Sequence, residues 1–183
     1  MLYARGSFSG NYIPSDPAEL AQGNYIIGHE FAAPPEGWED REQGWGPVNQ
    51  EIAEIIVTRF ADKPIYAAST VARALRHIAP ELELAGVFKD TSSDTTGSKG
   101  GTWSELEQAR LLAGEGRPVH VGHAYHAARI AMQSQKMGLE PLLPDGLPSS
   151  FDAESAQWWC RSPWQWALRE VPGVLYLRYL GQI

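Results

Sequence analysis

The chain has 183 residues, of which 43% are hydrophobic and 20% charged, and its formal net charge is −7 at pH 7. A chain of this length can bury one sizeable core but offers little material for a second, so we expect a single globular domain over residues 1–183. The acidic balance, without a stripe of Lys or Arg, argues against a nucleic-acid partner.

Cys160 is the only cysteine, so the chain can form neither an intrachain disulfide nor a thiolate-rich zinc cluster, which suits a reducing cytoplasmic location. The first residues lack the continuous apolar core of a signal peptide. The longest late apolar run, VPGVLYLRYLG, is too short and interrupted to cross a bilayer. We therefore expect a soluble protein that does not insert into a membrane.

The first elements follow an N-terminal extension, residues 1–23. NYIIGHEF, residues 24–31, is an apolar run ending in glycine and polar residues, which is typical of a buried strand that opens into a loop. Residues 32–46 are crowded with Pro, Gly and Trp and predict a long irregular connection, a candidate lid. Its Trp38 and Trp45 either cover a pocket or pack the loop onto the domain.

Pro47 is placed to begin a helix that ends near Asp62 and buries Ile52, Ile55, Ile56 and Phe60. IYAAS, residues 65–69, predicts a second strand. Ser69 is placed to cap the next helix, which ends at Pro80. LAGVF, residues 84–88, predicts a third strand. The polar residues 89–101 form a second long loop, either a mobile flap or a plain surface loop.

Thr102 and Glu105 have the spacing of a capping box, before a helix whose expected buried face is Leu106, Ala109, Leu112 and Ala113. RPVHVGH predicts a strand, HAYHAARIAMQSQKM a helix ended by Gly138, and LEPLLP a further strand. Ser162-Pro163 begins a last helix, which we expect to break at Pro172-Gly173. Strands that alternate with helices in this way predict a three-layer, Rossmann-like α/β fold, with a mainly parallel sheet and helices on both faces.

Ligands of such folds bind at the carboxyl edge of the sheet, where strand ends meet helix amino termini. His126 and Arg129 lie three residues apart on one helix face, so Arg129 could clamp an anionic group while His126 acts as acid or base. The alternative is structural, with Arg129 paired to a carboxylate such as Glu107. The catalytic candidates are His126, Glu107 and His123. The ligand-binding candidates are Arg129, Ser69, Thr70, Gly28, His29, Glu30, Gly122 and Tyr125.

A metal site is not expected. His120 and His123 should face opposite sides of an extended segment, which leaves only His123 and His126, with His29 and Glu30, to converge on an ion. The chain lacks a ligand spacing such as HExxH. Nucleophilic catalysis is also disfavoured, because Cys160 lies in a Trp-rich segment and no serine lies in a GxSxG turn.

The chain resembles the SanA/ElyC/YdcF-like family of Rossmann-like α/β domains in three places. HAYHAAR carries Tyr125, His126 and Arg129 at the positions of the family's Ser-x-Tyr-His-x-x-Arg segment, with His123 where the family has a small hydroxyl residue. Glu107-Gln108-Ala109 is similar to its Glu-Asn-Ala helix start, and REVPGVLYLRYLG to its terminal helix. Where the family has Gly-Gly and Ser-Gly-Gly turns, this chain keeps only Gly28 and Ser69. The resemblance implies the fold, the site location and S-adenosylmethionine as a candidate cofactor.

The leading hypothesis is an enzyme, a transferase or a hydrolase or lyase, acting on a small anionic or nucleotide-like metabolite. Glu107 would orient Arg129 or a substrate hydroxyl, and Ser69 with helix amides would complete an anion cradle. The alternative is a non-catalytic binding or sequestering module for the same class of ligand. A third hypothesis is a structural interaction protein, in which the tryptophans of residues 157–166 form a contact patch. The same segment could instead pack within the core or in a homodimer.

Overall fold

The computed structural model describes residues 10, 12–35, 37, 44–88 and 101–183. Its sheet has four parallel strands in the order β3-β2-β1-β4. The strands are β1 (Tyr25–Gly28), β2 (Ile65–Ala68), β3 (Gly86–Phe88) and β4 (Pro118–Val121). The helices are α2 (Pro17–Ala21), α3 (Pro47–Phe60), α4 (Ser69–Ile78), α5 (Thr102–Ala113), α6 (Ala124–Lys136), the 3₁₀ turn η1 (Trp158–Cys160) and α7 (Pro163–Tyr179).

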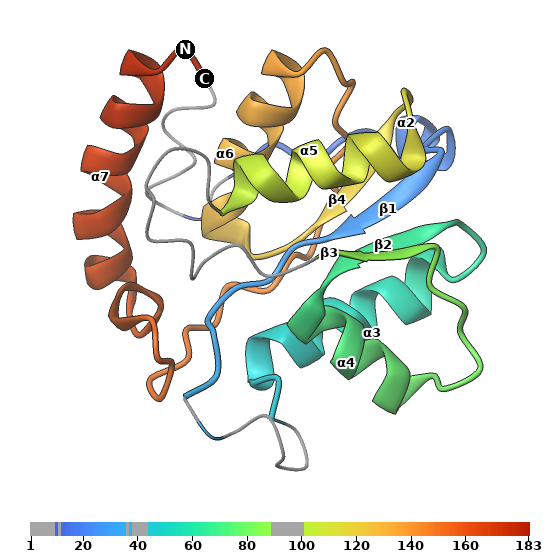
Figure 1. The fold of residues 1–183 in the computed structure, drawn as a ribbon, viewed down its shortest axis with the longest axis horizontal. Helices are drawn as coiled ribbons and strands as arrows, with labels where there is room; N and C mark the ends of the chain where they lie inside the picture. Colours follow the sequence, from blue (N-terminus) through green and yellow to red (C-terminus); the bar gives the residue numbers. More distant parts are fainter. Residues whose placement is uncertain (1–9, 11, 36, 38–43, 89–100) are drawn as a thin grey trace.

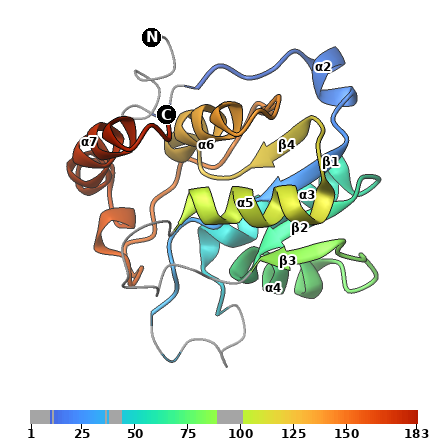
Figure 2. The ribbon, with the colours of Figure 1, turned by 45° about the horizontal axis from the view of Figure 1, so that its top comes forward.

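The sheet is covered on both faces, as the sequence predicts. Helices α3 and α4 lie on one face, and α5 and α6 on the other (Figures 1 and 2). The connections run outward from β1 through α3 and α4 to β3, then return across the other face through α5 to β4. The chain therefore reverses its winding direction between β1 and β4, and ligands of open α/β sheets bind at such a point.

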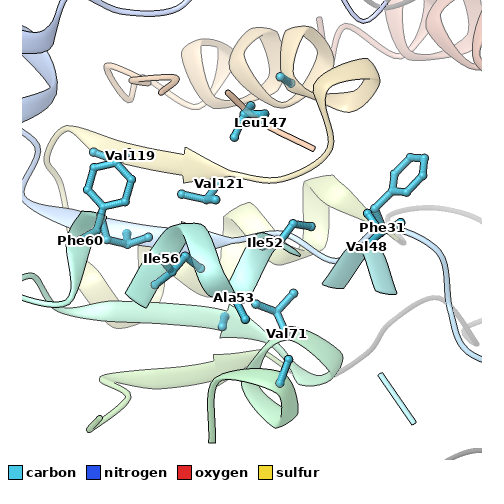
Figure 3. Packing of buried hydrophobic residues seen from close by; sticks show 14 of the residues in the cluster. Phe31, Val48, Ile52, Ala53, Ile56, Phe60, Val71, Val119, Val121 and Leu147 are labelled. Atoms are coloured by element: carbon cyan, nitrogen blue, oxygen red, sulfur yellow. The ribbon is translucent and has the colours of Figure 1, made fainter. Parts of the chain in front are cut away.

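The larger core lies between the sheet and the α3–α4 layer. Val119 and Val121 face Ile52, Ile56 and other residues of these helices (Figure 3). Ile26 belongs to the same cluster. A smaller cluster on the opposite face packs Tyr25, Ile27 and Phe88 against Leu106 and Ala109 of α5. Alternate residues of β1 thus point to opposite faces, which is the two-residue period of a strand covered on both sides.

Two predicted helix starts are wrong in detail. Ser69 does not cap α4: it is the first helical residue, and Ala68, the last residue of β2, is the N-cap. Thr102 begins α5 after Gly101, which has φ of 71°, and no capping box forms because Thr102 and Glu105 bond to groups in other elements. Leu112, expected in the buried face of α5, is 55% exposed.

The predicted strand LEPLLP is also wrong, since these residues form only one isolated bridge, between Val119 and Leu142. The next donors of this ladder would be Pro144 in one direction and Pro118 of β4 in the other, and neither has an N–H, so the ladder cannot extend. At the other end of the chain, α7 continues through Pro172-Gly173 rather than breaking there. Pro172 is exposed, so water can satisfy the carbonyl that loses its helical donor.

From Tyr12 onward, hydrogen bonds hold the predicted N-terminal extension against the domain. The Tyr12 hydroxyl donates to the carbonyl of Pro144 at 2.7 Å and accepts from Leu147 N at 3.1 Å. Asp16 caps the short helix α2. This segment therefore covers the loop that follows α6.

The described part of loop 32–46 packs onto the domain. The buried Asn49 side chain accepts from Phe31 N and donates to the carbonyls of Ala32 and Trp45, which joins the two ends of the loop. Trp45 is buried, with its ring centroid 4.9 Å from that of His77. Packing is therefore the role of Trp45, whereas Trp38 and nearly all of loop 89–101 lie outside the described residues.

Gly28 provides a test of how α3 and α4 pack against β1. A Cβ at Gly28 would lie 2.9 Å from Ile56 Cδ1 and 3.1 Å from Val71 Cγ1, so the glycine lets α3 and α4 pack against β1. We expect Gly28→Ala to lower the free energy of unfolding by about 1–3 kcal/mol through overpacking.

Ile56→Val removes the nearest of these atoms. The Gly28→Ala/Ile56→Val pair should therefore lose less stability than the sum of the two single variants, by about 1 kcal/mol in urea denaturation. Strict additivity would contradict a steric role for Gly28.

Candidate functional site at the carboxyl edge of the sheet

A buried chain of hydrogen bonds crosses the carboxyl edge at the point where β1 and β4 separate. His29 follows β1, and its Nδ1 lies 2.8 Å from Glu105 Oε2 on α5. Its Nε2 lies 3.0 Å from His120 Nδ1 on β4, and His120 Nε2 lies 3.0 Å from Ser134 Oγ on α6. Four elements are therefore joined through two imidazoles.

The protons of this chain can be assigned from its chemistry. The Glu105 carboxylate only accepts, so His29 Nδ1 donates to it. Burial, with a smaller effect of Arg129, lowers the pKa of His29 to about 3, and burial also lowers the pKa of His120. Both rings are neutral at pH 7, so His29 Nε2 accepts from His120 Nδ1, and His120 Nε2 accepts from the Ser134 hydroxyl.

A second cluster lies beside this chain, at the amino ends of α5 and α6. Thr102 Oγ1 is 2.7 Å from His126 Nε2 and accepts from Arg129 Nη1 at 3.3 Å. The His126 ring centroid is 6.5 Å from that of His29. The prediction that His126 and Arg129 share one face is confirmed by their common partner, Thr102.

Helix α7 closes this cluster from the outside. Arg129 Nε donates to Glu170 Oε1 at 2.9 Å, and the Glu170 side chain is 1% exposed. Trp166 packs on Phe31 and His126, with centroid distances of 5.1 and 5.7 Å. The carboxylate paired with Arg129 is therefore Glu170, which sequence reasoning missed, whereas Glu107 accepts from Trp103 on its own helix.

Two imidazole nitrogens of the edge are buried without a hydrogen-bond partner among the described residues, His123 Nδ1 and His126 Nδ1. Burial, with a smaller effect of Arg129, lowers the pKa of His126 well below 6.5. Burial also lowers the pKa of His123, to about 4. Both rings are neutral at pH 7. A buried polar atom left unpaired costs about 1–3 kcal/mol, so these atoms mark where a polar ligand group would be favourable.

The other predicted residues fall into three groups. Glu30 accepts from the Thr70 hydroxyl at 2.5 Å, which links the ends of β1 and β2, next to Ser69 at the start of α4. Gly122 faces His29, since a Cβ there would lie 3.2 Å from His29 Cβ. Tyr125 packs with Phe151 and His123 in an aromatic cluster rather than beside Arg129.

The possible metal ligands and the one thiol of the described residues can be placed as follows. No group of three or more His, Cys, Asp or Glu residues within the described ranges is arranged to hold a metal ion. Both nitrogens of His29 are already in hydrogen bonds, and His123 Nε2 donates to the carbonyl of Ser150. Burial raises the pKa of Cys160 to about 12, which keeps this thiol protonated.

Comparisons with protein-family models, with curated proteins and with solved structures found no match for this chain. The resemblance to the SanA/ElyC/YdcF-like family therefore stays a prediction. In the described residues, no helix has both the length and the apolar character needed to cross a membrane.

The buried histidines predict how stability depends on pH. The folded-state pKa values of His29 and His123 are about 3 and about 4, against 6.5 for an unperturbed histidine. Below pH 6.5 the unfolded chain therefore binds more protons than the folded chain, so the free energy of unfolding falls as the pH falls.

Urea denaturation of wild type should therefore show a clear loss of stability between about pH 7 and about pH 5. In His123→Gln this loss should be smaller by about 2 kcal/mol. An equal loss in the variant would show that His123 is protonated within the folded protein.

Proposed function

We propose that the chain binds a small anionic or nucleotide-like metabolite at the carboxyl edge and acts on it as an enzyme, with Arg129 as the anion clamp and His126 as acid or base. The observation that carries this proposal is the pairing of a guanidinium that has spare donors with a buried, unpartnered imidazole nitrogen. Arg129 uses Nε for Glu170 and one N–H of Nη1 for Thr102. Three of its five N–H groups have no acceptor among the described residues.

His126 complements this clamp in both of its neutral tautomers. When Nε2 accepts from the Thr102 hydroxyl, Nδ1 carries a proton that it can donate to a ligand oxygen. When Nε2 donates to Thr102, Nδ1 is a lone pair that can take up a proton. An anionic ligand beside the ring would favour its protonated form and so raise its pKa toward neutrality, the range in which an acid or base is effective.

The charge of Glu170 provides a test of the anion clamp, because this carboxylate neutralises the Arg129 guanidinium. Glu170→Gln leaves the guanidinium without an opposing charge, so we expect tighter binding of inorganic phosphate, by about tenfold. Arg129→Gln/Glu170→Gln removes both charges without leaving one of them buried and unpaired, and it should bind phosphate no better than wild type.

The measurement is calorimetric titration with inorganic phosphate and, separately, with S-adenosylmethionine. Arg59→Gln is the matched control, because Arg59 lies on α3 and pairs with Asp145 at the other end of the sheet. Equal affinities of Glu170→Gln and the double variant would remove Arg129 from the proposed function.

The second candidate function is a binding or sequestering module that uses the same cluster, favoured by the low pKa of His126, which makes the ring a weak base. His126→Gln separates the two. Incubation with a metabolite extract, followed by mass spectrometry of released ligand, should show a converted product with wild type and unconverted ligand with the variant. Recovery of unconverted ligand from both proteins would favour the binding module.

A further inference from the structure

Helix α7 has two apolar faces, and only one of them packs on the domain. Trp166 and Val174 are buried on the inner face, together with Glu170. On the outer face, five apolar side chains are between 45% and 86% exposed. These five residues are Trp164, Leu168, Val171, Leu175 and Tyr179, and we name them the outer stripe.

The outer stripe is narrow and continuous. With 3.6 residues per turn, its five members fall within an arc of about 80° along the whole helix. Figure 1 shows α7 at one side of the domain, with no other described helix or strand on its far side. An exposed apolar stripe of this length is typical of a protein contact surface.

Four members of the outer stripe are placed symmetrically along the helix. Trp164 and Tyr179 are equally far from the Val171-Pro172 peptide, and so are Leu168 and Leu175. A two-fold axis through this peptide would therefore place each large residue against another large residue, and self-complementarity of this kind is what an isologous dimer requires.

The geometry points to a homodimer in which the outer stripes of two copies pair antiparallel, with Trp164 against Tyr179 and Leu168 against Leu175 of the second copy. This inference does not depend on a ligand at the carboxyl edge.

The area of the stripe agrees with a dimer. Aromatic side chains bury on the order of 150–250 Å² each, and aliphatic ones somewhat less. At the observed exposed fractions the stripe, with the adjacent Tyr176, presents on the order of 600–700 Å² per copy. A pair would bury about 1,200–1,400 Å², within the range of specific interfaces.

The charges on α7 are also compatible with the proposed antiparallel pairing of two α7 helices. The helix has one acidic residue, Glu170, which is buried, and two arginines. Arg178 would lie across from Gln165, and Arg169 turns toward Trp159, with Cζ 5.7 Å from its ring. No like charges are opposed, whereas an anionic membrane surface would repel a protein of net charge −7.

Light scattering after size-exclusion chromatography tests the dimer. Wild type should have twice the 20.2 kDa chain mass. Leu168→Glu/Leu175→Glu should raise the dimer dissociation constant by at least about a hundredfold, because the two-fold axis repeats each buried charge. Leu111→Glu is the control, since Leu111 is 85% exposed on α5, and this variant should remain dimeric.

Cysteine cross-linking tests the register. Val171→Cys lies beside the proposed axis and should cross-link to its own copy under mild oxidation. Trp164→Cys should cross-link only when it is mixed with Tyr179→Cys. The native Cys160 is buried and should not interfere.

Three outcomes would overturn the proposal. A monomeric wild type at all concentrations excludes the dimer. Cross-linking of Trp164→Cys to itself indicates parallel helices. A monomer that sediments with phosphatidylcholine and phosphatidylglycerol vesicles through the outer stripe, and loses this binding in Leu168→Glu/Leu175→Glu, assigns the stripe to a membrane surface.

Discussion

The carboxyl edge of this protein depends on the hydrogen bonds of one buried imidazole. His29 follows β1, donates to Glu105 on α5 and accepts from His120 on β4, and His120 in turn accepts from Ser134 on α6. Loss of either proton acceptor would leave a buried N–H unpaired, which is unfavourable in a low-dielectric interior. This chain therefore fixes α5 and α6 relative to the strand ends between which the candidate site lies.

Helix α7 is held by a different kind of contact. Its inner face offers one aromatic ring, Trp166, and one carboxylate, Glu170, and both meet the cluster around Arg129. A buried ion pair adds little net stability, because desolvation of both charges offsets their attraction. The pair instead orients the helix, since it fixes which turn of α7 faces the domain. The same orientation directs the outer stripe toward solvent.

The fold could be predicted from the sequence because its signals are local. Helical spacing of Ile52, Ile56 and Phe60 and short apolar runs sufficed for the order of β1 to β4 with their helices and for a parallel sheet, although LEPLLP was wrongly predicted as a further strand. The failures came where a tertiary contact competes with a local preference. Thr102 and Glu105 have capping-box spacing, yet His126 and His29 are their partners. Pro172 resembles a helix break, but the exposed surface of α7 tolerates it.

The site could be placed only in part for the same reason. Topology brings His29, Gly122 and His126 to one edge, so their neighbourhood follows from the order of strands and helices. The partner of Arg129 could not be found in this way, because Glu170 lies 41 positions away in the sequence. The sequence signal for Glu170 is weak. It is an acidic residue that shares a helix face with the apolar Trp166 and Val174.

The Arg129–Glu170 pair has one further consequence. If a ligand carboxylate or phosphate engages the guanidinium as proposed, it competes with the Glu170 carboxylate for the same charge, and ligand binding and the attachment of α7 would then be thermodynamically linked. Linkage is reciprocal: any association that holds α7 in its present place weakens ligand affinity by the same factor by which the ligand weakens that association. Ligand binding at the carboxyl edge would in this way change the attachment of α7 at the protein surface.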